Sequence, residues 1–318
     1  MRAIVLTSTG EPDELRLTDL PRPRPEAGQL LLRAQAIGVS YAETQIRAGT
    51  LPFPLPLPAV IGAEVAGEVV EVGEGVDEKL IGGTMVGVTG GLGAYAEYVA
   101  LPAAMACPVP DGLAPEHALA GAAPGALALA LLHKAALTGA ETVLVEAGTS
   151  SVGSYLVRHA KEFGAGHVIA TAGSAAKRER AAALGADTVL DHATLGWPDG
   201  LPGDVDVIFE SIGGASAGQV LGHLTPGTGR MLYYGLLTGE PAAVTAADLM
   251  TRGVTVTACS GPAWAGQVFG THYPQMLARL AEGRSEAYLG RTLPLSRAAD
   301  AHRLLESRQL TGRILLTP

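Results

Sequence analysis

The stretch at residues 142–153, TVLVEAGTSSVG, places the strongest constraint on the fold of this chain. A short apolar run at 143–145 leads into a turn of small residues, and a helical pattern follows at 152–163. A buried strand, a small-residue turn and a helix form the opening of a βαβ unit. The helix N-terminus after such a turn offers unpaired N–H groups and a positive dipole, so the stretch predicts a phosphate-binding turn.

Strand-like and helical segments alternate between residues 122 and 258. This rhythm predicts a doubly wound parallel sheet of the Rossmann type. Residues 1–121 have a different texture, with short strands between glycine and proline corners, which is typical of a compact β-barrel-like fold. The strand patterns of the alternating region are 142–146, 167–171, 188–191, 205–210, 230–234 and 254–257.

Charge and composition exclude several classes of function. The chain has 22 Lys and Arg against 31 Asp and Glu, a net charge of −9, without basic runs, so we expect neither a nucleic-acid nor a membrane partner. The apolar stretch 118–132 contains Pro124 and is expected to be too short for a membrane span. No signal-peptide pattern opens the sequence. Cys107 and Cys259 are far apart, which favours reduced thiols in the cytoplasm over the alternative of a disulfide.

The end of the second strand indicates which nicotinamide cofactor would fit. An NAD site carries Asp or Glu about 20 residues past the turn, where it binds the ribose 2′-hydroxyl. Residues 169–174 read IATAGS, without an acid, and Lys177 and Arg178 follow. The hydroxyl of Ser174 and a nearby cation suit a 2′-phosphate, so NADPH is favoured over NADH. The alternative is that the two cations are solvated helix residues, which applies more to Arg178 than to Lys177.

Neither a metal site nor a serine-hydrolase site is indicated. Cys107 and Cys259 do not form a closely spaced ligand pair, the eight histidines are scattered, and HExxH is absent. The GxSxG motif of the hydrolase nucleophile is absent as well.

The polar stretch 40–47, SYAETQIR, follows a strand candidate that ends at residue 39. Ser40 followed three residues later by Glu43 fits a capping box at the start of a helix. Such a cap is compatible with a functional role, because it would present Tyr41 and Gln45 to a cleft.

Motifs along the whole chain resemble the medium-chain dehydrogenase/reductase superfamily, specifically its zinc-free quinone oxidoreductase branch. The zinc alcohol dehydrogenases of this superfamily have a metal-binding histidine where this chain has Ala63, which agrees with a metal-free site. The motifs are GVSYAET at 38–44, GAEVAG at 62–67, GAYAEYV at 93–99, the turn at 147–153, ESIG at 210–213 and GRILL at 312–316.

The resemblance implies an α/β protein with two domains. A GroES-like, β-rich catalytic domain is formed by residues 1–121 and 259–318, and a Rossmann domain lies between them at 122–258. NADPH is implied in the cleft between the domains, with hydride transfer to the β-carbon of an enone or a quinone. Relatives commonly form homodimers through edge strands, here at about 230–257; the alternative is an internal edge strand covered by the following helix.

Site residues can be transferred from the family position by position. Ser40, Tyr41, Glu43 and Gln45 are implied to border the nicotinamide and the substrate. Stretches 51–58 and 260–273 are expected to shape the mouth of the pocket, where Trp264 and Phe269 favour a small apolar or aromatic carbonyl substrate. The implied cofactor-binding residues are Leu127, Ser150, Ser151, Val152, Gly153, Thr171, Gly173, Ser174, Lys177, His192, Ser211, Ile212, Gly213, Tyr234, Gly235, Leu236 and Arg313.

Departures from the family pattern cluster around the expected cofactor. Leu127 stands where a threonine usually meets the nicotinamide amide, Glu146 stands where histidine is frequent, and Ser150 and Ser151 replace glycines. A second hypothesis is therefore a redox-neutral isomerase, cyclase or lyase on the same scaffold, with a weakened or lost cofactor site. A third hypothesis is a non-catalytic binding protein, which no residue pattern supports.

Overall fold

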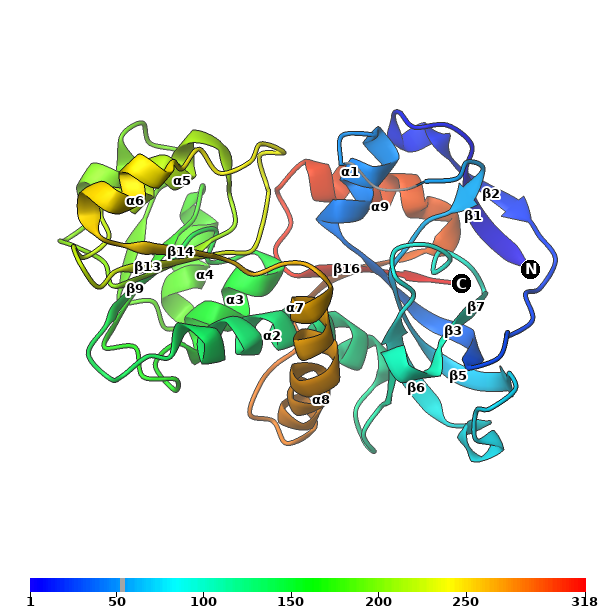
Figure 1. Cartoon of the computed structure of the whole chain (residues 1–318). Helices are drawn as coiled ribbons and strands as arrows, with labels where there is room; N and C mark the ends of the chain where they lie inside the picture. The colour runs from blue at the N-terminus through cyan, green and yellow to red at the C-terminus, as the bar shows by residue number, and fades with distance from the viewer. Residues whose placement is uncertain (52–54) are drawn as a thin grey trace. The chain divides into compact units, whose positions relative to one another are not determined.

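The computed structural model describes residues 1–51 and 55–318, and the chain divides into two compact units. Unit 1 comprises Met1–Ala123 and Tyr273–Pro318, and unit 2 comprises Pro124–His272 (Figure 1). Both ends of the chain therefore belong to unit 1. Three residues of the proline-rich stretch 51–58 lie outside the described residues.

Unit 1 is built mainly from β-strands in two sheets. The larger sheet has seven strands, in the order β15–β16–β3–β5–β6–β8, with β7 also paired to β3. These strands are β15 (Leu289–Pro294), β16 (Arg313–Thr317), β3 (Gln29–Val39), β5 (Glu64–Val72), β6 (Thr84–Val88), β8 (Ala106–Pro108) and β7 (Tyr98–Pro102). The smaller sheet has the order β2–β1–β4, formed by β2 (Leu15–Asp19), β1 (Arg2–Leu6) and β4 (Ala59–Val60).

Strand β16, at the C-terminus, lies in the interior of the larger sheet. It pairs antiparallel with β3, so that Ile314 faces Val39 in register, and parallel with β15. The apolar residues of these strands, together with α8 (Tyr273–Ala281) and α9 (Ala298–Glu306), supply much of the core of unit 1. Strand β3 ends one residue before helix α1 (Tyr41–Ala48), so the sheet fixes where that helix begins.

Unit 2 contains one six-stranded sheet in which every pairing is parallel. The order is β11–β10–β9–β12–β13–β14, so the chain winds outward from β9 in one direction and then resumes beside β9 at β12. The predicted doubly wound sheet is confirmed, and its topological switch point lies between β9 and β12. The strands are β9 (Thr142–Val145), β10 (His167–Thr171), β11 (Thr188–Leu190), β12 (Val207–Glu210), β13 (Arg230–Tyr233) and β14 (Thr255–Ala258).

The helices of unit 2 alternate with its strands. Two of them, α6 and α7, were not predicted, because they are short and bury none of their residues, so no apolar periodicity marks them. The helices are α2 (Pro115–Ala135), α3 (Ser151–His159), α4 (Ala175–Ala183), α5 (Gly214–Leu221), α6 (Ala246–Arg252) and α7 (Pro262–Gln267).

Helix α2 corrects two expectations from the sequence. The pattern predicted a helix only from residue 126, yet α2 begins at Pro115 and continues through Pro124, where unit 2 begins. An interior proline normally breaks a helix, but buried residues such as Leu129 and Leu131 hold this one by packing. With 21 residues it is long and apolar enough to cross a membrane, so the argument from length was wrong. Since 78% of its apolar window is buried, α2 has the character of a core helix.

Candidate functional site

Most of the predicted cofactor residues of unit 2 lie directly after strands of the parallel sheet. Because the carboxyl ends of parallel strands share one edge, the turns after β9, β10, β12 and β13 meet at that edge. His192 follows β11 at the same edge, whereas Leu127 lies apart on α2 and is half-buried. Ligands of doubly wound sheets bind outside this edge, at the switch point.

The turn between β9 and α3 accommodates its two serines. Ser150 has φ −67°, which any residue can adopt, and its hydroxyl accepts the N–H of Gly153 at 3.1 Å as the N-cap of α3. The strained position is Ala147, with φ 49°. No acceptor in the described part of the chain bonds the N–H groups of Ser151 and Val152. With serines in place of the usual glycines, the turn therefore still has two N–H donors available at the helix N-terminus.

Two glycines of this turn are required by close packing. A Cβ at Gly153 would lie 2.3 Å from the carbonyl oxygen of Ala147, and a Cβ at Gly148 would lie 2.8 Å from the Cβ of Ala170 on β10. Both contacts are shorter than van der Waals separation. The missing side chain of Gly148 therefore lets the turn sit against β10, and that of Gly153 lets the turn close on itself.

Thr171 connects three segments of the carboxyl edge. Its Oγ1 accepts the N–H of Ala147 at 3.0 Å and lies 3.0 Å from Nδ1 of His192. The same imidazole covers Gly173, where a Cβ would be 2.8 Å from Nε2. The first turn, the end of β10 and the segment after β11 are thus tied together beside the predicted 2′-phosphate position.

The segment after β10 carries hydroxyl and cationic groups. Ser174 is the N-cap of α4, and its hydroxyl accepts the N–H of Lys177 at 3.4 Å. Arg178 forms an ion pair with Asp191, the acid that follows β11. Lys177 is half-buried in the first turn of α4. Arg178 therefore has a partner within unit 2, and the assignment of Lys177 to the 2′-phosphate stays a prediction.

The turns after β12 and β13 pack backbone against backbone. The N–H of Leu237 bonds the carbonyl of Ser211 at 3.0 Å, and a Cβ at Gly235 would lie 2.8 Å from the Cβ of Ser211. Oε1 of Glu210 accepts the N–H groups of Ile212 and Gly213 at 2.8 and 2.7 Å. The sequence analysis did not include Glu210 among the site residues. The signal was present, since β9 and β12 both lead into a glutamate that follows an apolar run.

In unit 1 the predicted catalytic residues fall on two faces of α1. Glu43 is buried and accepts the N–H of Ser40 at 2.7 Å, so the capping box predicted for this pair is confirmed. Tyr41 and Gln45 lie one turn apart on the opposite, half-buried face. The guanidinium of Arg308 lies 5.9 Å from the centre of the Tyr41 ring.

Glu43 belongs to a buried hydrogen-bond network. Its Oε1 accepts the N–H of Ala63 at 2.8 Å, and its Oε2 lies 3.0 Å from the hydroxyl of Tyr95, which also lies 3.0 Å from Nε2 of His302. Burial raises the pKa of Glu43 to about 7, and burial together with Arg47 lowers the pKa of His302 to about 3. Glu43 thus acts within unit 1, holding the start of α1.

The network predicts a pH-dependent stability. In the folded chain the pKa of Glu43 is about 7, against an ordinary value of 4.5. The stability that its neutral form contributes is therefore full below pH 4.5 and is lost as the pH rises through 7. We expect about 2 kcal/mol less stability at about pH 8 than at about pH 5 from this group. Denaturant unfolding should show this decline in the wild type and a smaller one in Glu43→Gln. An identical decline in both would contradict the prediction, and Glu78→Gln, at an exposed position, is the control.

Arg313 lies in a buried ion pair. Its Nη2 donates to Oε1 of Glu64 at 2.6 Å, and neither side chain is more than 11% exposed. The contact to the cofactor that the resemblance implied for Arg313 stays a prediction.

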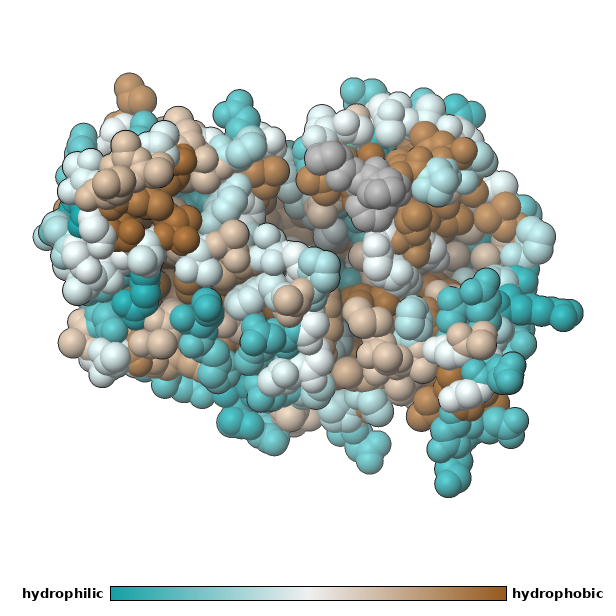
Figure 2. All heavy atoms as spheres, viewed as in Figure 1, coloured by the Kyte–Doolittle hydropathy of each residue, from teal (hydrophilic) through white to brown (hydrophobic). Residues whose placement is uncertain are grey.

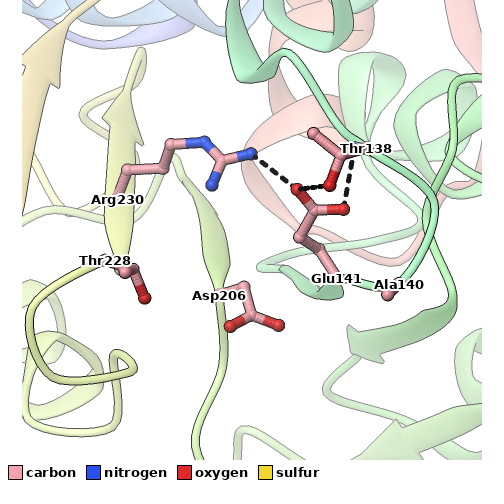
Figure 3. Close-up of a pocket in the computed structure, with 6 residues that line it drawn as sticks. All are labelled: Thr138, Ala140, Glu141, Asp206, Thr228 and Arg230. Carbon is pink, nitrogen blue, oxygen red and sulfur yellow. Dashed lines mark hydrogen bonds and ion pairs between the residues drawn. The ribbon is translucent and has the colours of Figure 1, made fainter.

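A hollow of about 280 Å³ lies at the opposite edge of the unit 2 sheet (Figure 3). Glu141, Asp206 and Arg230 precede or begin the strands β9, β12 and β13 there. Glu141 accepts hydrogen bonds from Thr138 and from Arg230, as the dashed lines in Figure 3 show. These groups stabilise the amino edge of the sheet. Within residues 1–51 and 55–318, no cluster of three or more His, Cys, Asp or Glu side chains has the arrangement of a metal site.

Two families of known proteins match the two kinds of domain. The family described as alcohol dehydrogenase GroES-like domain matches residues 26–111. The family described as zinc-binding dehydrogenase matches residues 151–282.

Similar proteins extend over the whole chain. A 2-haloacrylate reductase from a Burkholderia species is 32% identical over 99% of this chain and 98% of its own length. A mycobacterial protein solved in complex with NADPH superposes with a TM-score of 0.89 at 31% identity, covering 100% of both chains. Escherichia coli quinone oxidoreductase complexed with NADPH gives 0.91 at 27% identity, also over 100% of both chains. The chain belongs to the medium-chain dehydrogenase/reductase superfamily, as one of its quinone oxidoreductase-like members.

Proposed function

We propose that this protein is a metal-independent, NADPH-dependent reductase of a quinone or an enone. The observation that carries the proposal is the start of α3. Among the described residues, no acceptor bonds the N–H groups of Ser151 and Val152 there. Unpaired N–H groups at a helix N-terminus bind phosphate, and this one follows the first strand of a doubly wound sheet. Full-length relatives solved with NADPH support the same assignment.

The residues present fit a dinucleotide. Gly153 and Gly148 have no side chains that would keep the pyrophosphate away from the backbone of the first turn. Ser174 and Lys177 offer a hydroxyl and an ammonium group to the 2′-phosphate. The segments 211–213 and 234–236 form the neighbouring turns of the same edge. Asp191 does not oppose the 2′-phosphate, because Arg178 neutralises it.

Bound NADPH would supply the hydride, and the chain would supply orientation and shielding from water. Tyr41 and Gln45 are the residues of unit 1 that we assign to the substrate, because they share the outer face of α1. Glu43 and Ser40 hold that helix start in place. We expect a small apolar or aromatic carbonyl substrate.

The test is NADPH oxidation followed by absorbance with a panel of quinones and enones, alongside a fluorescence titration of NADPH. We expect micromolar binding and turnover of at least one acceptor class. Absence of NADPH binding at high micromolar concentration would overturn the proposal.

A redox-neutral enzyme on the same scaffold is the second candidate. It is favoured by Leu127 where a threonine usually meets the nicotinamide and by Glu146, a buried acid after β9. The two candidates differ in stoichiometry. One NADPH consumed per product formed supports the reductase, and product formed without consumption supports the isomerase, cyclase or lyase.

Replacing Lys177 by alanine should weaken NADPH binding by about 10- to 100-fold, because a charge-assisted hydrogen bond contributes about 1.5–3 kcal/mol. NADH lacks the 2′-phosphate, so its affinity should change little. Paired titrations of both cofactors measure the ratio. Lys161→Ala, which removes a lysine paired with Asp187 elsewhere in unit 2, is the matched control. Equal losses for NADPH and NADH would show that Lys177 does not recognise the 2′-phosphate.

We also propose a cytoplasmic homodimer that pairs through the edge of the unit 2 sheet. Strand β14 is the last strand on its side of the sheet. Both cysteines are free thiols, which suits the cytoplasm. Figure 2 shows hydrophobic atoms gathered around α6, whose Met250 is 83% exposed. An apolar surface near an open strand edge suits association of two copies. Light scattering on the purified protein tests the dimer. Thr255 and Cys259 donate their N–H groups to β13, so alternation turns the N–H of Val256 to the open edge, and Val256→Pro should shift the protein toward monomer.

A further inference from the structure

Two buried carboxyl groups meet at the switch point of the unit 2 sheet. Glu146 follows β9 directly and Glu210 ends β12, the two strands between which the winding direction changes. The N–H of Glu146 donates to the carbonyl oxygen of Phe209 at 3.2 Å, so the two glutamates are neighbours across β9 and β12, and their side chains have exposures of 1% and 0%. Oε1 of each has a hydrogen-bond partner, whereas Oε2 of each is buried and has none in the described part of the chain, which suits a proton held between the two groups.

Electrostatics requires a proton between these two groups. Among the described residues, neither carboxyl has a Lys, Arg or His partner. The titratable groups that face the pair are Tyr233 and Tyr234, from β13 and the turn after it, and burial raises the pKa of both. Two carboxylates in contact without a cation cannot both stay ionised in a buried site.

The proton belongs on Glu146. Glu210 accepts two backbone N–H groups, which favour its ionised form, whereas Glu146 accepts only the hydroxyl of Ser216, at 3.1 Å. Burial and the Glu210 carboxylate raise the pKa of Glu146 well above its ordinary value. We therefore place the proton on Glu146, although burial raises the pKa of Glu210 as well.

The pair holds together three segments of the proposed dinucleotide site. Glu210 fixes the turn at 211–213 through the N–H groups of Ile212 and Gly213. Glu146 links the end of β9 to the first turn of α5 through Ser216. A second negative charge here would push β9 and β12 apart at the edge where the cofactor is proposed to bind.

We propose that the Glu146–Glu210 pair is a positioning element, whose shared proton holds the turn at 211–213 in the conformation that receives the dinucleotide. This inference rests on the proposed NADPH binding. Removal of the proton at alkaline pH loosens the turn and weakens the cofactor, without either glutamate touching it.

The experiment measures the NADPH dissociation constant between about pH 6.5 and pH 10 for the wild type, Glu146→Gln and Glu146→Ala. An amide at position 146 still donates to Glu210 and cannot ionise. The wild type should lose affinity at least about tenfold across the range, and Glu146→Gln should change less than about twofold. Glu146→Ala should bind weakly at every pH. Glu179→Gln, at an exposed glutamate of α4, is the matched control and should follow the wild type.

Parallel pH profiles for the wild type and Glu146→Gln would overturn the inference. Ionisation of the NADPH phosphate is common to all variants, so it cancels in the comparison. Unfolding of the cofactor-free protein provides a separate readout. If no variant binds NADPH at any pH, the proposed function fails. A stability decline above neutral pH that is present in the wild type and smaller in Glu146→Gln would then still establish the shared proton.

Discussion

Replacement of Arg313 by methionine should destabilise the protein by about 3–5 kcal/mol, because it leaves the carboxylate of Glu64 buried without its partner. Methionine fills a similar volume, so the loss reports the uncompensated charge and not a cavity. Nη2 of Arg313 also packs on the backbone at Gly38, where a Cβ would be 2.9 Å away. Denaturant unfolding at neutral pH measures the change in the free energy of unfolding.

The double variant Glu64→Gln with Arg313→Met supplies the control. With both charges removed, we expect recovery of most of the lost stability, since a buried pair is often replaceable by neutral groups. A single-variant loss below about 1 kcal/mol would show that Glu64 reaches solvent or becomes protonated at little cost. A role of Arg313 in cofactor binding would appear separately, as an NADPH affinity that the double variant fails to recover.

Replacement of Gly153 by alanine should destabilise unit 2 by about 3 kcal/mol and weaken NADPH binding by roughly 100-fold or more. The added Cβ would lie 2.3 Å from the carbonyl oxygen of Ala147 and 2.9 Å from Oγ of Ser150. Relief of these short contacts requires a shift of the turn away from α3. That shift moves the unpaired N–H groups from the position in which they would meet a phosphate.

Gly203→Ala is the matched control, since a Cβ there meets nothing within 4 Å. It should leave both stability and NADPH affinity close to the wild type. If Gly153→Ala binds NADPH as the wild type does, the turn after β9 is not the pyrophosphate site, and the proposed placement of the cofactor fails.

Periodic segments of the fold were predictable from the sequence. The range 167–171 predicted for β10 and the end predicted for β3 at residue 39 agree with the observed strands, because continuous apolar runs with β-branched residues mark buried strands. Helices α6 and α7 were missed because they contribute no residue to the core. Helix α2 was predicted only from residue 126, and a helix that continues through Pro124 is not expected from local proline chemistry.

The candidate site was predictable where the backbone decides it. The turn at 147–153 and the capping box of Ser40 and Glu43 follow from local chemistry, and both occur as expected. Contacts between segments that are far apart in the sequence could not be predicted. No local pattern indicates that Tyr95 and His302 would join Glu43, or that Glu146 and Glu210 would be neighbours at the ends of β9 and β12. Such pairs arise from sheet order, which only the folded chain displays.

The interior position of β16 determines the order in which the two units can be completed during synthesis. Unit 2 is a single continuous segment, and all its strands have been synthesised before residue 273 is added. Unit 1 is completed later, because β16, at Arg313–Thr317, occupies a place between β15 and β3. Pairing β3 with β16 closes a loop that contains all of unit 2, and domains generally fold as units during translation. A chain released before residue 313 therefore has a finished unit 2 and, in unit 1, an open, aggregation-prone edge at β3.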